Sequence, residues 1–299
     1  MSWRDYRMLK RRLYGHVYKL ACEFGPRNLE HLAALDKTRE YIQQQMSHYN
    51  NNLSTHDYLV THTLIQNLIA EQTGHQYPDE IIVIGAHYDT VKDSPGADDN
   101  ASGVAGMLEL IRLMKFYENQ RTLRFIAFNL EEPPFFGTEE MGSHRYANHC
   151  KALNENIVAM ISLEMLGFYT EKRGTQKYPG AGMIGRYDTR GNFIAVVGNN
   201  QSRELGNFVA RKLDEMALIK TKEMIHPTPV FGSDLSDHSS FWKHNYPAIM
   251  ITDTAFYRNP HYHETSDTID KLNFRYFARL VYSLAYMIQQ LDAEQSLTK

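Results

Sequence analysis

The stretch IIVIGAHYDT, residues 81–90, decides the fold, because a run of β-branched and apolar residues breaks off there into polar ones. Such a run predicts a strand that is buried on both faces. A helical pattern begins at Ser102, and a second apolar run, LRFIAFNL at 123–130, follows it. Strand, helix and strand in this order predict two parallel strands joined by a crossover helix.

The same alternation continues on both sides of this unit. Two helices are expected first, over 4–22 and about 30–47, with Gly25 and Pro26 breaking between them. The other expected elements are extended segments at 58–62 and 64–70, a short helix near 141–150, strands at 156–166, 192–198 and 247–253, and helices at 203–216 and about 272–291. We therefore expect an α/β fold, a three-layer sandwich with a central, mostly parallel mixed β-sheet flanked by helices.

Composition limits the classes of protein that fit. The 299 residues are 42% hydrophobic and show no linker-like shift, which predicts a single domain over 1–299 with a large core. A formal net charge of −3 without a basic stripe excludes nucleic acid and anionic membrane as expected partners, and leaves small molecules or peptides. The sequence does not indicate an oligomeric state.

Location and cysteine chemistry follow from the same reading. No apolar stretch approaches the ~20 residues that span a bilayer, and the first residues lack the apolar core of a signal peptide. The chain as given is therefore expected to be cytoplasmic, or exported to the periplasm or medium if a signal segment was removed. Cys22 and Cys150 form no CxxC pair, so we expect buried small hydrophobes rather than zinc ligands or a disulfide.

Ligand-type side chains follow the predicted strands at their carboxyl ends, where loops converge in such folds. They are His87 and Asp89, then Glu131 and Glu132, then Glu164, together with Asp98, Asp99, His261, His263 and Asp267 in the loops. Taken alone, the glutamate pair also reads as two solvated acids before a turn at Pro133. Two imidazoles and several carboxylates without a thiolate suit zinc or another borderline divalent ion. One ion needs only three or four ligands, so five or six candidate ligands predict two ions that share a carboxylate.

Six segments, in order, resemble the co-catalytic zinc aminopeptidase family, whose relatives include glutamate carboxypeptidase and glutaminyl cyclases. They are IGAHYDT, GADDNASG, the strand with the two glutamates, SLEMLG, SDHSSF and YHETSDT. With the early GPRN, the likeness covers nearly the whole chain. It implies the phosphorylase/hydrolase-like fold of zinc aminopeptidases.

The resemblance also implies a ligand set for two zinc ions. In that reading His87 and Glu164 hold one zinc, Glu132 and His263 hold the other, and Asp99 bridges them. Asp99 satisfies the family spacing of an acid, two residues and then Ser-Gly. Many relatives have aspartate where this chain has Glu164.

Four more residues receive roles from the resemblance. Asp98 is expected to be structural, and Asp89 to hydrogen-bond the second nitrogen of His87. Glu131 is expected to act as the general base that takes a proton from water and returns it to the leaving amine. Tyr262 resembles the family tyrosine that donates its hydroxyl to the developing oxyanion, with plain packing as the alternative.

Several segments keep two interpretations. Asp237 and His238 either support the site or fix a loop, and Asp267 either orients His263 or caps the last helix. The stretch 168–192 is either a rim over the pocket or a surface loop, and Phe135 and Phe136 are expected to line a side-chain pocket. Surface or loop positions are expected for His226, His244 and His261.

Three functions compete. The first is a zinc-dependent aminopeptidase that hydrolyses N-terminal residues of peptides. The second is a glutaminyl cyclase with one zinc, although tyrosine before the last histidine favours the peptidase. The third is a non-catalytic binding domain like the transferrin receptor's ectodomain, which ranks last because every ligand position is filled.

Overall fold

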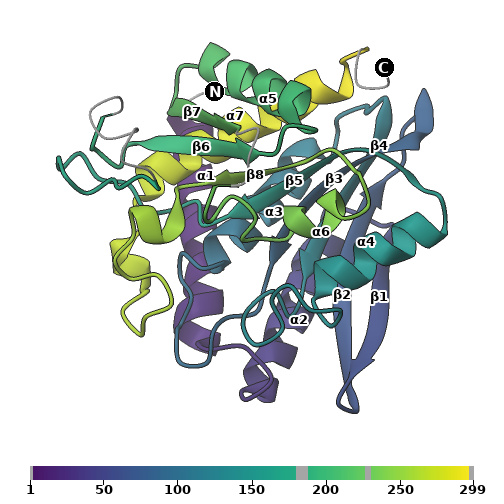
Figure 1. Ribbon diagram of the computed structural model, residues 1–299, viewed down its shortest axis with the longest axis horizontal. Coiled ribbons are helices and arrows are strands. Elements are labelled where there is room, and N and C mark those ends of the chain that lie inside the picture. The colour runs from purple at the N-terminus through teal and green to yellow at the C-terminus, as the bar shows by residue number, and fades with distance from the viewer. Residues whose placement is uncertain (1–2, 180–187, 226–229, 296–299) are drawn as a thin grey trace.

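A single β-sheet runs through the part of the chain that the computed structural model describes, residues 3–179, 188–225 and 230–295. Its strands lie in the order β1-β2-β4-β3-β5-β8-β6-β7 (Figure 1). Their bounds are β1 Leu53–Val60, β2 Thr63–Gln72, β3 Tyr77–His87, β4 Arg121–Phe128, β5 Asn156–Glu164, β6 Phe193–Gly198, β7 Lys220–Ile225 and β8 Ala248–Thr252. The predicted mixed, mostly parallel sheet is confirmed.

Helices cover both faces of this sheet (Figure 1). They are α1 Trp3–Val17, α2 Leu32–Ser47, α3 Ala101–Met114, α4 Gly142–Ala152, α5 Arg203–Glu215, α6 His238–Trp242 and α7 Phe274–Asp292. The first helix continues as a π-helical turn, Tyr18–Phe24, before the chain breaks at Gly25. None of the described helices is both long and apolar enough to cross a membrane.

The two faces bury cores of different size. The larger core lies between the sheet and the layer formed by α1, α2, α3, α5 and α7. A smaller core lies on the other face, beneath α4 and α6. Helix α3 is buried along almost its whole length because it is enclosed by the sheet, α1 and α7. This enclosure fixes the N-terminus of α3 against the carboxyl ends of the strands.

Four neighbouring strands, β4, β3, β5 and β8, are parallel to one another. Their carboxyl ends therefore meet at one edge of the sheet, where His87 and Glu164 terminate β3 and β5. The β1–β2 hairpin turns through Thr61 and His62, both at positive φ, as tight hairpins require.

Two details differ from the sequence prediction. Strand β7 was not expected, because KTKEMI is largely polar; it pairs with β6 at the edge of the sheet. Cys22 is exposed rather than buried, although its neighbours Leu20 and Ala21 in the same π-helical turn are buried. Cys150 is buried as expected, and both thiols are free.

Candidate metal centre

The loop before α3 places Asp99 at the centre of the site. The carboxylate of Asp267 accepts hydrogen bonds from the backbone amides of Asp98, at 3.0 and 3.1 Å, and Asp99, at 3.0 Å. Neither predicted role of Asp267 is right, since it neither orients His263 nor caps α7, whose N-cap is Asn273. Asp267 instead shapes the backbone that carries the central carboxylate.

The neighbouring Asp98 is fully buried and contacts other parts of the chain. Its oxygens accept hydrogen bonds from the Gly167 amide at 2.8 Å, from Ser102 Oγ at 3.1 Å and from Asn259 Nδ2 at 2.9 Å. These contacts tie the loop after β5 to the loop after β8, which is the structural role that the sequence predicts for Asp98.

Asn100 completes the loop as the N-cap of α3. Its side-chain oxygen accepts from the amides of Gly103 at 3.0 Å and Met165 at 3.1 Å, and its amide nitrogen donates to the Leu163 carbonyl at 2.9 Å. A Cβ on Gly103 would meet that side chain and the Leu163 carbonyl within 2.4 Å, so only glycine allows this approach.

Two groups of ligand-type residues share Asp99. His87 Nε2 lies 3.5 Å from Asp99 Oδ1 and 3.3 Å from Glu164 Oε2. His263 Nε2 lies 3.4 Å from Asp99 Oδ2 and 3.1 Å from Glu132 Oε2. Within each group the ligand atoms lie within 4.8 Å of one another. The structure thus brings together all five predicted metal ligands, with one oxygen of Asp99 facing each histidine.

The donor set fits zinc. Both ring nitrogens of His87, Asp99 Oδ2 and Glu132 Oε1 are buried and lack a hydrogen-bond partner among the described residues. An unpaired buried polar atom costs ~1–3 kcal/mol, and three of these atoms, His87 Nε2, Asp99 Oδ2 and Glu132 Oε1, belong to the ligand groups, which indicates a missing partner there. His87 Nδ1 faces Asp89 instead. Imidazole nitrogens and carboxylate oxygens without sulfur are a donor set for zinc or another borderline divalent ion.

Asp89 holds the backbone of the two glutamates in place. Its two oxygens accept hydrogen bonds from the amides of Glu131 at 3.1 Å and Glu132 at 3.0 Å. Oδ1 also lies 3.4 Å from His87 Nδ1, close but without hydrogen-bond geometry. The predicted partner of Asp89 is therefore adjacent, and its strongest contacts are to the turn that presents the two glutamates.

The two glutamates sit differently in the cluster. Glu132 Oε2 lies 3.1 Å from His263 Nε2, whereas the nearest ion-pair contact of Glu131 is between its Oε2 and His87 Nε2, at 3.7 Å. Glu131 also forms a third group with His87 and Glu132 whose ligand atoms lie within 4.8 Å of one another, so its place beside the cluster is close enough for either a ligand or a base. Burial raises the pKa of Glu131 well above its usual range, and Glu164 adds to this while His87 opposes it. Burial also raises the pKa of Glu132, reinforced by Asp99. Cations bound between these groups would reverse both shifts.

The segment SDHSSF fixes Glu164. Ser236 Oγ donates to Glu164 Oε2 at 2.8 Å, a contact that the sequence analysis missed although it singled out this segment. His238 Nε2 is 2.8 Å from the Ser233 carbonyl, so it fixes the preceding loop. Asp237 is fully buried near the site, and burial raises its pKa to about 7.

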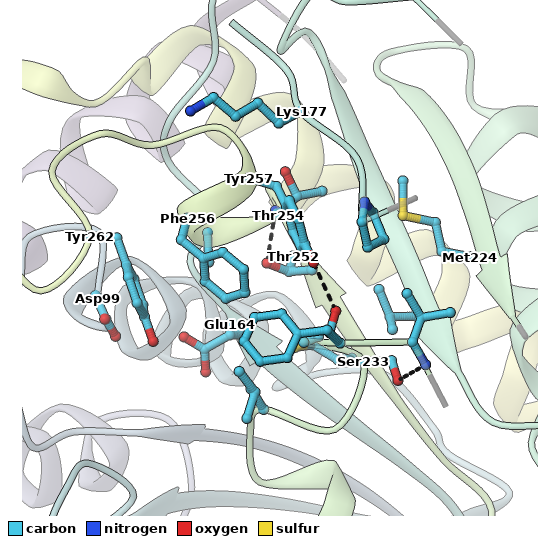
Figure 2. A pocket seen from close by; sticks show the side chains of 18 of the residues that line it. Asp99, Glu164, Lys177, Met224, Ser233, Thr252, Thr254, Phe256, Tyr257 and Tyr262 are labelled. Carbon is cyan, nitrogen blue, oxygen red and sulfur yellow. Dashed lines mark hydrogen bonds between the residues drawn. The ribbon is translucent and has the colours of Figure 1, made fainter. Parts of the chain in front are cut away.

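A cavity of ≈ 220 Å³ opens from the cluster (Figure 2). Its floor is a row of apolar side chains across three paired strands, Met250 of β8, Val197 of β6 and Met224 of β7. Phe256 and Tyr257 form a wall.

Tyr262 lines the metal end of the cavity, next to Asp99 in Figure 2. Its ring stacks on His263 with centroids 3.8 Å apart and contacts Phe256 at 5.5 Å. Burial raises the pKa of Tyr262, reinforced by the charge of Asp99, so its hydroxyl keeps its proton.

Predictions about the pocket lining are partly right. Phe136 lines the cavity, but Phe135 packs beside the β1–β2 hairpin instead. Within the stretch 168–192, residues 176–179 line the cavity, whereas 180–187 lie outside the described residues, as does His226. His244 and His261 are half-buried and outside the cluster.

Comparison with known sequences adds a family and relatives. The model of "Peptidase family M28" matches residues 67–288. The uncharacterised protein YfbL of Escherichia coli is 39% identical over 264 residues, 86% of this chain and 80% of YfbL. A probable leucine aminopeptidase of Arthroderma otae is 27% identical over 213 residues, 66% of this chain and 49% of that protein. The chain therefore spans about half the length of that fungal relative.

Solved structures share the fold. BSAP, a zinc aminopeptidase from Bacillus subtilis, superposes with a TM-score of 0.74 at 15% identity, over 94% of this chain and 95% of BSAP. A glutaminyl cyclase from Tannerella forsythia reaches 0.68 at 16% identity, over 94% of this chain and 98% of the cyclase. Since both enzyme types share the architecture, the fold alone does not choose between the reactions.

Proposed function

The chain is a peptide hydrolase that belongs to peptidase family M28, and we propose that it is an aminopeptidase that removes the first residue of peptides with two zinc ions and water. The observation that carries this proposal is the pair of ligand groups that share Asp99, one with His87 and Glu164 and the other with Glu132 and His263. A one-zinc reaction has no need of a second complete group.

The residues divide the chemistry as follows. Bound zinc supplies Lewis acidity, which lowers the pKa of water and polarises the scissile carbonyl. Glu131 takes a proton from the attacking water and gives it to the leaving amine, which its position beside the cluster permits. The Tyr262 hydroxyl donates a hydrogen bond to the carbonyl oxygen as that oxygen gains charge.

The position of the cluster at one end of the cavity fits an exopeptidase. The residues that would hold zinc cluster at one end of the cavity, so the amine end of a peptide lies against them while the apolar floor accepts the first side chain. Met224 and Met250 are flexible and adapt to different apolar shapes. The rest of the peptide then leaves through the mouth of the cavity.

The test is mass spectrometry of a peptide mixture after incubation with zinc-loaded protein. The mixture contains peptides that begin with leucine or glutamine and an N-acetylated copy of each, and a parallel sample contains a chelator. We expect loss of the first residue from the free peptides alone, abolished by the chelator. Loss of ammonia from the glutamine peptide only would identify a glutaminyl cyclase, and no change would refute the proposal.

A further inference from the structure

One lysine stands at the mouth of the cavity. Among the described residues that line the cavity, Lys177 is the one with a lysine or arginine side chain. This side chain is exposed. Among the described residues no carboxylate forms an ion pair with its amine. Figure 2 shows the amine extended toward the side of the cavity where Tyr262 and Asp99 lie.

The backbone that carries Lys177 is held firmly. The Lys177 amide donates to the Tyr257 carbonyl at 2.7 Å. The preceding Gln176 is buried, and its side chain donates to Thr254 Oγ1 at 2.9 Å and accepts from Arg258 Nε at 2.8 Å. Lys177 therefore starts from a fixed point beside the pocket wall, and its position at the mouth is built into the fold.

Arg258 is the anchor of this arrangement. It is 4% exposed, donates to the Phe193 carbonyl at 2.8 Å and lies over the Phe193 ring at 4.4 Å. Arg258 is buried, and its guanidinium interacts electrostatically with Asp253 inside the protein. Among the described residues that line the cavity, Lys177 is thus the lysine or arginine available to a ligand.

We infer that Lys177 recognises a carboxylate on the part of the substrate beyond the cleaved bond, an inference that rests on the proposed function. In the proposed function the amine end of the peptide lies against the metal ligands and the first side chain lies on the apolar floor. The following residue therefore extends toward the other lining residues, among them Lys177. A carboxylate there is either the C-terminus of a dipeptide or an acidic second side chain. The enzyme is thereby biased toward very short or acidic peptides.

The activity test compares Leu-Ala, Leu-Ala-amide and Leu-Glu-amide as substrates of the zinc-loaded enzyme. An exposed ion pair of this kind changes kcat/KM by about threefold to fivefold. We expect wild type to prefer the substrates with a carboxylate and Lys177→Met to lose that preference through KM, without change on Leu-Ala-amide. Preference for Leu-Ala alone identifies the C-terminus as the recognised group, and preference for Leu-Glu-amide identifies the side chain.

Two matched variants complete the design. Lys177→Arg keeps the charge and should keep most of the preference, whereas Lys172→Met changes an exposed lysine of the same loop outside the cavity lining and should have no effect. The preference should also disappear in about 1 M salt, where screening is strong. A Lys177→Met variant that keeps the preference, or that slows all three substrates equally, would overturn the inference.

A binding measurement separates this inference from the proposed function. Calorimetry with Leu-Ala and Leu-Ala-amide analogues, in which CH₂–NH replaces the peptide bond, needs no turnover. Lys177→Met should weaken the binding of the acid analogue alone, by about threefold to fivefold. If wild type binds the acid analogue more tightly but hydrolyses none of the three peptides, the proposed function is refuted and the role of Lys177 is supported. If wild type binds both analogues equally, the role of Lys177 is overturned.

Discussion

Replacing Glu131 with glutamine separates proton transfer from metal binding. The amide has the shape of the carboxylate, so the packing of this buried side chain, 7% exposed, is kept. The change removes the general base, which commonly costs ~10²–10⁴-fold in rate, or about 3–5 kcal/mol in activation free energy. Because Glu131 lies 3.7 Å from His87 while Glu132 lies 3.1 Å from His263, we expect the variant to retain its zinc.

The assay pairs kcat on a leucine-initial peptide with zinc content determined by plasma mass spectrometry. Glu132→Gln is the matched control, since the same chemical change one residue later should release zinc from the His263 group. An active Glu131→Gln enzyme, or one that has lost zinc, would show that the two glutamates do not divide the work in this way.

Three further changes test other parts of the structure. Glu109→Gln removes the charge that pairs with Arg12 of α1 and Arg112 of α3, and it should lower the free energy of unfolding in urea by about 3 kcal/mol. Burial opposes the shift, but the hydrogen bond to His16 and the two arginines lower the folded pKa of Glu109. The difference should therefore be full above about pH 4.5 and shrink as pH falls through the folded pKa, and a pH-independent difference would contradict the assignment. Ser236→Ala removes the hydrogen bond to Glu164 and should lower the affinity for zinc about tenfold or more, measured by competition with a chelator. Unchanged affinity would mean that Glu164 is held by other contacts. Val197→Phe fills the cavity floor and should lower kcat/KM for leucine-initial peptides far more than for alanine-initial ones; an equal loss would show that the first side chain lies elsewhere.

The ligand residues were predictable because their positions follow from strand patterns. His87, Glu132 and Glu164 each come at or just after the carboxyl end of a buried apolar run, and neighbouring parallel strands bring such ends together. The choice of Asp99 over Asp98 came from a family spacing rather than from any local physical signal. The hydrogen bonds of Asp98 now supply the physical reason.

What the sequence missed depends on contacts between distant segments. Asp267 accepts hydrogen bonds from backbone amides almost 170 positions earlier, and no residue near it in the sequence predicts those partners. Ser236 likewise meets Glu164 only after α6 packs on the sheet. Strand β7 lies at the sheet edge, where one partner strand and solvent exposure remove the apolar pattern that marks buried strands.

The central claim is that two zinc ions share Asp99. Anomalous diffraction at the zinc absorption edge, on crystals of the zinc-loaded protein, tests it most directly. The account predicts two peaks, one among His87, Asp99 and Glu164 and the other among Asp99, Glu132 and His263. A single peak, or a peak that Glu131 coordinates, would contradict it.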